Sequence, residues 1–259
     1  MFVDQEEQQL SDEFIKNGFI KRKVGDVDSL EQIKEKLLKI VSSYKDLNNK
    51  NIILENIHNH IPSESLNDFR LFCINELSKS SELRVSYYKV FKKFTDQIIG
   101  NELAMQKKLN LSIQLPKDSS SLLTIHADTW SGDSPFETVC WLPMVDCTKT
   151  MCMFILPAYN YNFFEQKYSD LKNKNSDELL KSLRDKLLWI EIKFGEVLVF
   201  NQNLPHGNVV NNENSSRWSF NCRFKSIFTP YKDKKIGEFF EPITLKASSK
   251  IGLKYKFPS

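Results

Sequence analysis

The sequence predicts an α+β fold in which N-terminal helices pack on a core of short β-strands. In the first third of the chain, apolar residues recur at helical spacing. From Leu111 onward, short apolar and aromatic runs are separated by Gly, Pro, Asn, Asp and Ser, a pattern typical of strands joined by turns. About eight such runs follow one another, as expected of a jelly roll, the cupin-like double-stranded β-helix.

Helices are predicted at 29–41, 64–78 and 82–103. Asp28 or Ser29 is the expected N-cap of the first helix, because both side chains can accept a hydrogen bond from a free backbone N–H. The apolar stripe of that helix consists of Leu30, Ile33, Leu37, Leu38 and Val41. Stripes of this kind are packing faces, so we expect this layer to cover the strands.

Strands are predicted at 111–115, 122–126, 136–142, 152–156, 188–193, 196–200, 206–210 and 217–224. The chain is therefore divided into a helical region 1–110, a double-stranded β-helix core 111–230 and a C-terminal extension 231–259 that includes an edge strand. A charged, helical insertion at 161–186 interrupts the strands midway, a position suited to a lid over a substrate.

Composition excludes several classes of function. The formal charge of +3 and the absence of a concentrated Lys/Arg tract argue against a nucleic-acid partner. No stretch reaches the roughly 18 apolar residues that span a bilayer, and the N-terminus has no signal-peptide pattern, so no membrane partner is expected. The five cysteines include no CxxC pair, which favours reduced thiols in a cytoplasmic protein without a structural zinc site.

Three residues form a candidate metal site. His126 and Asp128 are two positions apart, so in an extended chain their side chains point to the same face. His206 comes much later, at the start of another predicted strand. Two imidazoles and one carboxylate on one face of an octahedron leave three positions open, which suits Fe(II) and O₂ chemistry.

A polar row on the last predicted strand completes the constellation. By alternation, Arg217, Ser219, Asn221 and Arg223 share one face of that strand. Burying such a row is unfavourable without a partner. A dicarboxylate would supply one, because a guanidinium binds a carboxylate with two parallel hydrogen bonds and the Ser219 hydroxyl can donate beside it.

These motifs, taken in order, resemble the Fe(II)/2-oxoglutarate-dependent dioxygenase superfamily. The resemblance covers about Leu111 to Phe224 and is greatest for the branch that includes phytanoyl-CoA hydroxylase and hydroxylases of antibiotic and carbohydrate clusters. The motifs are His126-x-Asp128, Trp141-Leu-Pro143, a strand ending Ile-Leu-Pro157, Phe194-Gly-Glu-Val-Leu-Val-Phe200, His206 and Arg217-x-Ser219.

The resemblance implies a set of roles and cofactors. His126, Asp128 and His206 would hold Fe(II), and Arg217 with Ser219 would bind the far carboxylate of the co-substrate 2-oxoglutarate. O₂ would take the remaining coordination position. Related halogenases have a small residue where this chain has Asp128, so the resemblance favours hydroxylation, or desaturation or epimerisation by the same oxidant.

The sequence departs from the family pattern at one place and leaves two roles open. The Pro-Gly-Ser-His motif common in the family is here Pro157-Ala-Tyr-Asn160, which changes a loop but not the metal ligands. Arg223 shares its face with Arg217 and is a second candidate for binding the co-substrate, or else forms a substrate contact or a structural ion pair. Gln114 either lines the co-substrate pocket or makes a hydrogen bond in the core.

The expected function is O₂-dependent hydroxylation of a small molecule, such as a sugar or a secondary-metabolite intermediate. One alternative is a lipid or acyl-chain hydroxylase of the phytanoyl-CoA type, which would need a narrow apolar tunnel where a sugar would need a wide polar cleft. The other is a non-catalytic, metal-binding cupin-like module, which would have no use for an arginine that binds 2-oxoglutarate.

Overall fold

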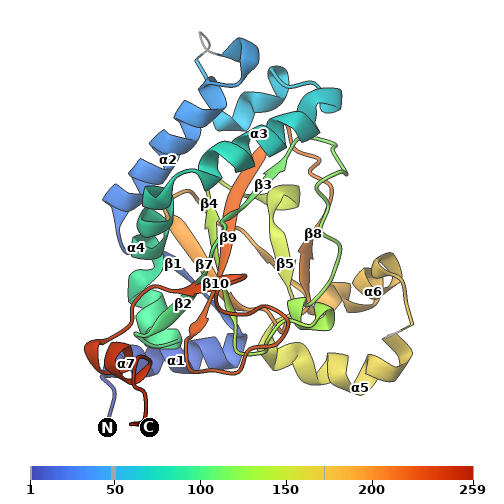
Figure 1. The fold of residues 1–259 in the computed structure, drawn as a ribbon. Coiled ribbons are helices and arrows are strands. Elements are labelled where there is room, and N and C mark those ends of the chain that lie inside the picture. Colours follow the sequence, from blue (N-terminus) through green and yellow to red (C-terminus); the bar gives the residue numbers. More distant parts are fainter. Residues whose placement is uncertain (1, 48–50, 172, 259) are drawn as a thin grey trace.

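The computed structural model of the chain describes residues 2–47, 51–171 and 173–258. Its strands form two antiparallel sheets (Figure 1). The larger sheet has the order β1-β7-β4-β9-β2-β10, with β3 also paired to β9, and the smaller has the order β6-β5-β8. The strands are β1 (Phe19–Lys23), β2 (Leu103–Gln106), β3 (Asn110–Gln114), β4 (Thr138–Pro143), β5 (Met153–Ile155), β6 (Leu188–Ile190), β7 (Glu196–Asn201), β8 (His206–Asn208), β9 (Arg217–Ser226) and β10 (Phe240–Pro242).

Helices surround the sheets on two sides. The bounds are α1 (Gln5–Asn17), α2 (Val27–Ser42), α3 (Leu66–Ser78), α4 (Ser81–Ile98), α5 (Tyr161–Leu171), α6 (Ser176–Leu183) and α7 (Ala247–Gly252). Helices α2, α3 and α4 cover the larger sheet, and one apolar core joins them to it, whereas α5 and α6 lie beside the smaller sheet (Figure 1). Among the described residues, no helix combines the length and the apolar character needed to cross a bilayer.

The predicted helices are confirmed, with corrections at two of their ends. Helix α2 begins earlier than expected because Asp26 is its N-cap, with the Asp26 carboxylate accepting a hydrogen bond from Ser29 N at 2.9 Å, so the predicted caps were wrong. The predicted helix 82–103 ends in fact at Ile98. Gly100 adopts φ = 122°, a conformation that glycine tolerates and a helix does not, and the next residues form β2.

The predicted strand 122–126 was wrong, because this segment pairs with β8 only at its two ends. Asn208 N donates to Leu123 O at 2.8 Å, and His126 and His206 exchange both backbone hydrogen bonds. Between these two pairings the 123–126 side has one residue more than β8, as in a β-bulge. The segment therefore lies along β8 without forming a regular ladder.

Both terminal regions contribute to the larger sheet. Residues 1–110, which were expected to be helical, also provide β1 and β2, and the C-terminal extension provides the edge strand β10. The insertion at 161–186 forms α5 and α6, as expected. The division into three regions stays a prediction.

Gly207 in β8 allows the two histidine segments to approach. A Cβ atom at this position would lie 2.7 Å from Leu123 O and 2.8 Å from Phe154 Cζ. We expect Gly207→Ala to lower the free energy of unfolding by about 1–3 kcal/mol, because a backbone oxygen and a buried ring must move. Chemical denaturation measures this, with Gly252→Ala as control, since nothing lies within 4 Å of that Cβ. Equal denaturation midpoints for the two variants would contradict the packing argument.

Candidate functional site

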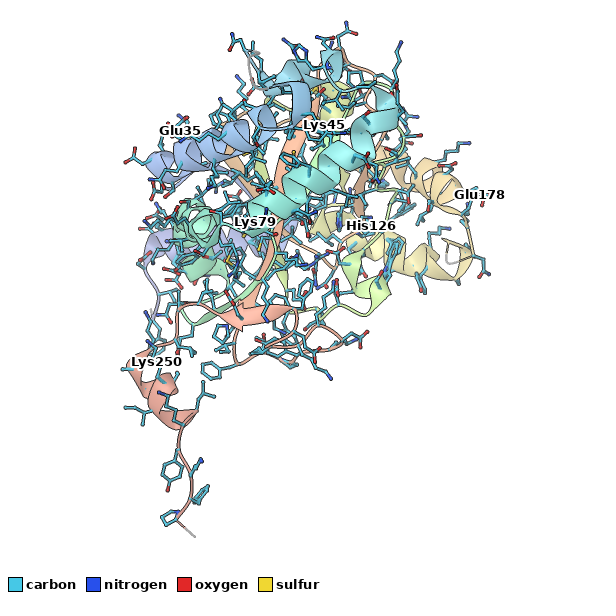
Figure 2. The ribbon with its side chains drawn as sticks, turned by 45° about the horizontal axis from the view of Figure 1, so that its top comes forward. Glu35, Lys45, Lys79, His126, Glu178 and Lys250 are labelled. Atoms are coloured by element: carbon cyan, nitrogen blue, oxygen red, sulfur yellow. The ribbon has the colours of Figure 1, made fainter. Side chains whose placement is uncertain are left out.

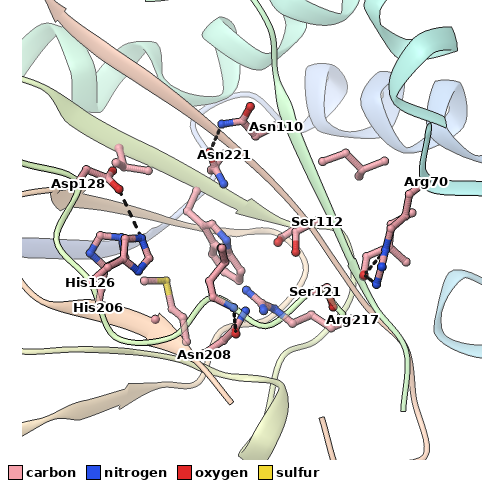
Figure 3. Close-up of a pocket in the computed structure, with 18 of the residues that line it drawn as sticks. Arg70, Asn110, Ser112, Ser121, His126, Asp128, His206, Asn208, Arg217 and Asn221 are labelled. Atoms are coloured by element: carbon pink, nitrogen blue, oxygen red, sulfur yellow. Dashed lines mark hydrogen bonds and ion pairs between the residues drawn. The ribbon is translucent and has the colours of Figure 1, made fainter. Parts of the chain in front are cut away.

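Three side chains from two distant segments of the chain converge at the β8 edge of the smaller sheet. Single donor atoms of His126, Asp128 and His206 all lie within 4.8 Å of one another (Figure 3). The two histidines are placed by their paired backbones, and Asp128 opens a short 3-10 turn two residues after His126. Atoms that bind one ion at about 2 Å lie no more than about 4 Å apart, so small side-chain shifts would bring these donor atoms to binding distance. Figure 2 marks the position of His126, whose side chain is 33% exposed.

Both imidazoles are oriented by backbone carbonyls. His126 Nδ1 lies 2.7 Å from Thr124 O, and His206 Nδ1 lies 2.8 Å from Leu204 O. A carbonyl only accepts, so each Nδ1 carries a proton and Nε2 is the ring nitrogen left for a metal ion. Such outer hydrogen bonds are the usual way in which a protein fixes the tautomer of a metal-binding histidine.

The protonation states of the three groups suit a cation. Burial, with the neighbouring His126, lowers the pKa of His206 to about 4, so its imidazole is neutral at physiological pH. Burial raises the pKa of Asp128, but the hydrogen bond with His126 and the Arg223 charge outweigh it and hold that pKa well below its usual range. For His126, burial lowers the pKa and the Asp128 hydrogen bond raises it, with a net rise. A metal ion would displace the shared proton.

Arg217 is a buried cation without a matching anion. Its side chain is 3% exposed, and none of the ion pairs formed by the described residues includes it. Its Nη1 lies 3.4 Å from Gln114 Oε1, its guanidinium lies 5.4 Å from the centre of the Trp141 ring, and its Nε has no hydrogen-bond partner. The Ser219 hydroxyl, on the same face of β9, is also buried and unpartnered. Leaving such groups unsatisfied is unfavourable, so an anionic ligand is indicated here.

A single cavity of about 510 Å³ connects these two features. The three candidate metal ligands lie at one end of it, and Arg217 lines it further along (Figure 3). One wall of the cavity carries amides and hydroxyls. These residues are Asn67, Asn110, Ser112, Ser120, Ser121 and Asn221. Apolar side chains line the same cavity, so it is mixed in character and differs from the uniformly apolar tunnel that an acyl chain would need.

Comparisons with solved structures identify the architecture. The nickel complex of the non-haem monooxygenase ThoJ aligns over 94% of this chain and 91% of its own, with a TM-score of 0.56 and 14% identity. SnoK, a non-haem α-ketoglutarate-dependent carbocyclase of nogalamycin biosynthesis, aligns over 94% and 97%, with a TM-score of 0.58 and 11% identity. HygX from Streptomyces hygroscopicus, solved with nickel and 2-oxoglutarate, aligns over 88% and 89%, with a TM-score of 0.50 and 13% identity.

The chain has the fold of these non-haem oxygenases. The double-stranded β-helix prediction is thereby confirmed. The phytanoyl-CoA hydroxylase branch is not singled out among the similar structures. No protein-family model matches the sequence, and no curated protein does.

Within this oxygenase fold, Arg223 forms the ion pair that was one of its expected roles. Its Nη2 donates to Asp128 Oδ2 at 2.7 Å, and its Nε donates to Gln202 Oε1 at 2.9 Å. Asp133 lies 3.7 Å from the same guanidinium and is itself paired with Lys234. Arg223 thus holds one oxygen of Asp128 and leaves Oδ1 facing His126. The Arg223 guanidinium is therefore already paired with a carboxylate, whereas, within the described residues, the Arg217 guanidinium is not.

Of the two roles expected for Gln114, the structure shows the hydrogen bond in the core. Gln114 is not among the residues that line the cavity. Its Nε2 donates to Val209 O at 2.7 Å, so its Oε1 is turned toward Arg217. Arg223 also contacts Gln202 and Asp133, and neither of these two residues was predicted from the sequence. No pattern pointed to them, because both lie outside the strands and helices and reach the site only through tertiary packing.

Proposed function

We propose that this protein is an Fe(II)- and 2-oxoglutarate-dependent oxygenase that hydroxylates a small molecule. The observation that carries the proposal is the pairing of two features in one cavity. Two imidazoles and a carboxylate converge at one end, and an unpaired buried arginine with an unpartnered serine hydroxyl lies along the same cavity. A purely structural cupin-like module has no need for the second feature.

The metal-binding residues in this proposal are His126, Asp128 and His206. The donor set of two neutral imidazoles and one carboxylate suits Fe(II) with open positions. Arg223 positions Asp128, and the Thr124 and Leu204 carbonyls position the imidazoles, so the set is held before the ion arrives. When bound, Fe(II) with 2-oxoglutarate and O₂ supplies the oxidation of a C–H bond.

The co-substrate site consists of Arg217 and Ser219. The guanidinium would bind the distal carboxylate of 2-oxoglutarate with two hydrogen bonds, and the Ser219 hydroxyl would donate to it. Gln114 keeps the Arg217 side chain in place from behind. Binding of this anion would satisfy the two polar groups that the protein itself leaves without partners.

The prime substrate in this proposal is a small molecule, and a sugar or secondary-metabolite intermediate fits best. The cavity volume lies within the range of small-molecule sites, about 300–1,000 Å³. SnoK, which shares the fold, is a carbocyclase from nogalamycin biosynthesis. An acyl-chain hydroxylase is disfavoured by the amides and hydroxyls of the cavity wall.

The test is stepwise reconstitution of the purified protein. Under anaerobic conditions we expect Fe(II) to bind, and 2-oxoglutarate then to produce the visible absorption of a 2-oxo acid chelated to ferrous iron. Admission of O₂ should release succinate in slow uncoupled turnover even without a prime substrate. Iron binding with no response to 2-oxoglutarate would support the non-catalytic module instead.

A further inference from the structure

We propose that the polar wall of the cavity binds an uncharged, hydroxyl-bearing substrate through the side-chain amide of Asn221, with Ser112 beside it. The inference rests on the proposed function, because it concerns the substrate side of the same cavity. It assigns a specificity role to residues that neither the metal site nor the co-substrate site uses.

Asn221 and Ser112 face the cavity from neighbouring strands. In the β3–β9 register, Asn110 lies opposite Asn221 and Ser112 lies opposite Ser219. Alternation places these side chains on one face of the sheet, together with Arg217 and at the cavity. The polar wall therefore continues directly from the co-substrate site.

A chain of hydrogen bonds determines whether the Asn221 side chain presents its amide oxygen or its amide N–H to the cavity. The Arg223 backbone N–H donates to Gln106 Oε1 at 3.2 Å, so Gln106 Nε2 is the donor toward Asn110 Oδ1, at 3.1 Å. Asn110 Nδ2 then donates to Asn221 Oδ1 at 2.9 Å (Figure 3). Because a backbone N–H can only donate, the orientation of every amide in the chain follows.

The consequence is that a cavity-lining side chain keeps an N–H donor without a partner in the described part of the protein. No hydrogen bond is formed by Asn221 Nδ2 within the described residues, although Asn221 lines the cavity. Such a donor matches an oxygen of the substrate, either a hydroxyl, an ether or a carbonyl. The Ser112 hydroxyl can both donate and accept, which suits a neighbouring hydroxyl group. An apolar chain would satisfy neither group.

Charge pairing argues that this oxygen is uncharged. Arg70, the cation of this wall, is paired with Asp118 at 2.7 Å and also donates to Ile113 O and Ser120. Arg223 is paired with Asp128. Arg217 is assigned to 2-oxoglutarate. A phosphate or carboxylate on the substrate would therefore enter without a free cation to replace its water.

The test is calorimetric titration of protein loaded with Ni(II), a redox-inert substitute for iron, and 2-oxoglutarate. The probes are methyl glucoside, methyl galactoside and methyl mannoside, compared with glucose 6-phosphate and 1-octanol. We expect at least one neutral glycoside to bind more tightly than both comparison compounds. Asn221→Leu should weaken that binding by about tenfold, the loss expected for one hydrogen bond with its N–H donor removed.

Two further variants keep the result interpretable. Asn221→Ser replaces the amide donor with a hydroxyl donor and should recover part of the affinity if the leucine variant folds poorly. Asn101→Leu, at an exposed asparagine outside the cavity, should bind the glycoside as the wild type does. Glycoside binding that is indifferent to Asn221, or that is absent for all three glycosides, overturns the inference. Loading with Ni(II) and 2-oxoglutarate is measured first, so its failure would count against the proposed function itself.

Discussion

Replacement of His206 by alanine is expected to abolish ferrous-ion binding and all 2-oxoglutarate turnover. His206 contributes a neutral, buried imidazole whose orientation is fixed by the Leu204 carbonyl, so alanine leaves only two of the three ligands. The affinity for Ni(II) or Fe(II) should fall by more than about 100-fold, beyond the 10–100-fold typical of losing an outer hydrogen-bond partner. Anaerobic titration of the apoprotein measures it directly.

Matched variants separate metal loss from misfolding. The His206 ring packs against Phe200, with ring centroids 4.9 Å apart, so alanine also opens a void. His206→Gln keeps most of the bulk and should lose the metal equally. His60→Ala removes a histidine that lies outside the cavity and should bind the metal as the wild type does. A His206→Ala protein with unchanged metal affinity would disprove the assigned ligand set.

Substitution of Arg217 by methionine is expected to separate co-substrate binding from stability. Loss of even one charge-assisted hydrogen bond, worth about 1.5–3 kcal/mol, should weaken 2-oxoglutarate binding by about 10–150-fold, and loss of both by more. The apoprotein should be at least as stable as the wild type, because the substitution removes a buried cation that no anion matches. Thermal denaturation of the metal-loaded protein with and without 2-oxoglutarate tests both points.

Two comparisons make the Arg217 result specific. Arg217→Lys keeps the charge but lacks the planar fork, so it should recover only part of the 2-oxoglutarate affinity. Arg184→Met, at an exposed arginine outside the cavity, should leave 2-oxoglutarate binding unchanged. If the methionine variant bound 2-oxoglutarate normally, Arg217 would not be the carboxylate-binding residue and Arg223 would have to be reconsidered.

Strand alternation alone is enough to predict which face of β9 lines the cavity. Arg217, Ser219, Asn221 and Arg223 all lie there, as the two-residue period requires. The same reasoning was less successful at 122–126, because it takes no account of an extra residue in a pairing. Asp128 nevertheless reaches the two histidines, since the bulge and the 3-10 turn together bring it to the same place.

The sequence by itself determined the chemical inventory of the site and the type of most elements, because side-chain periodicity and turn residues are properties of a few neighbouring positions. Only the tertiary structure decided which arginine is free. Arg217 and Arg223 are equivalent by alternation, and they differ because Asp128 and Gln202, distant in the chain, are hydrogen-bonded to one of them. The direction of the Asn221 amide was decided in the same way, because it depends on a hydrogen-bond chain that crosses from β2 to β3 and β9.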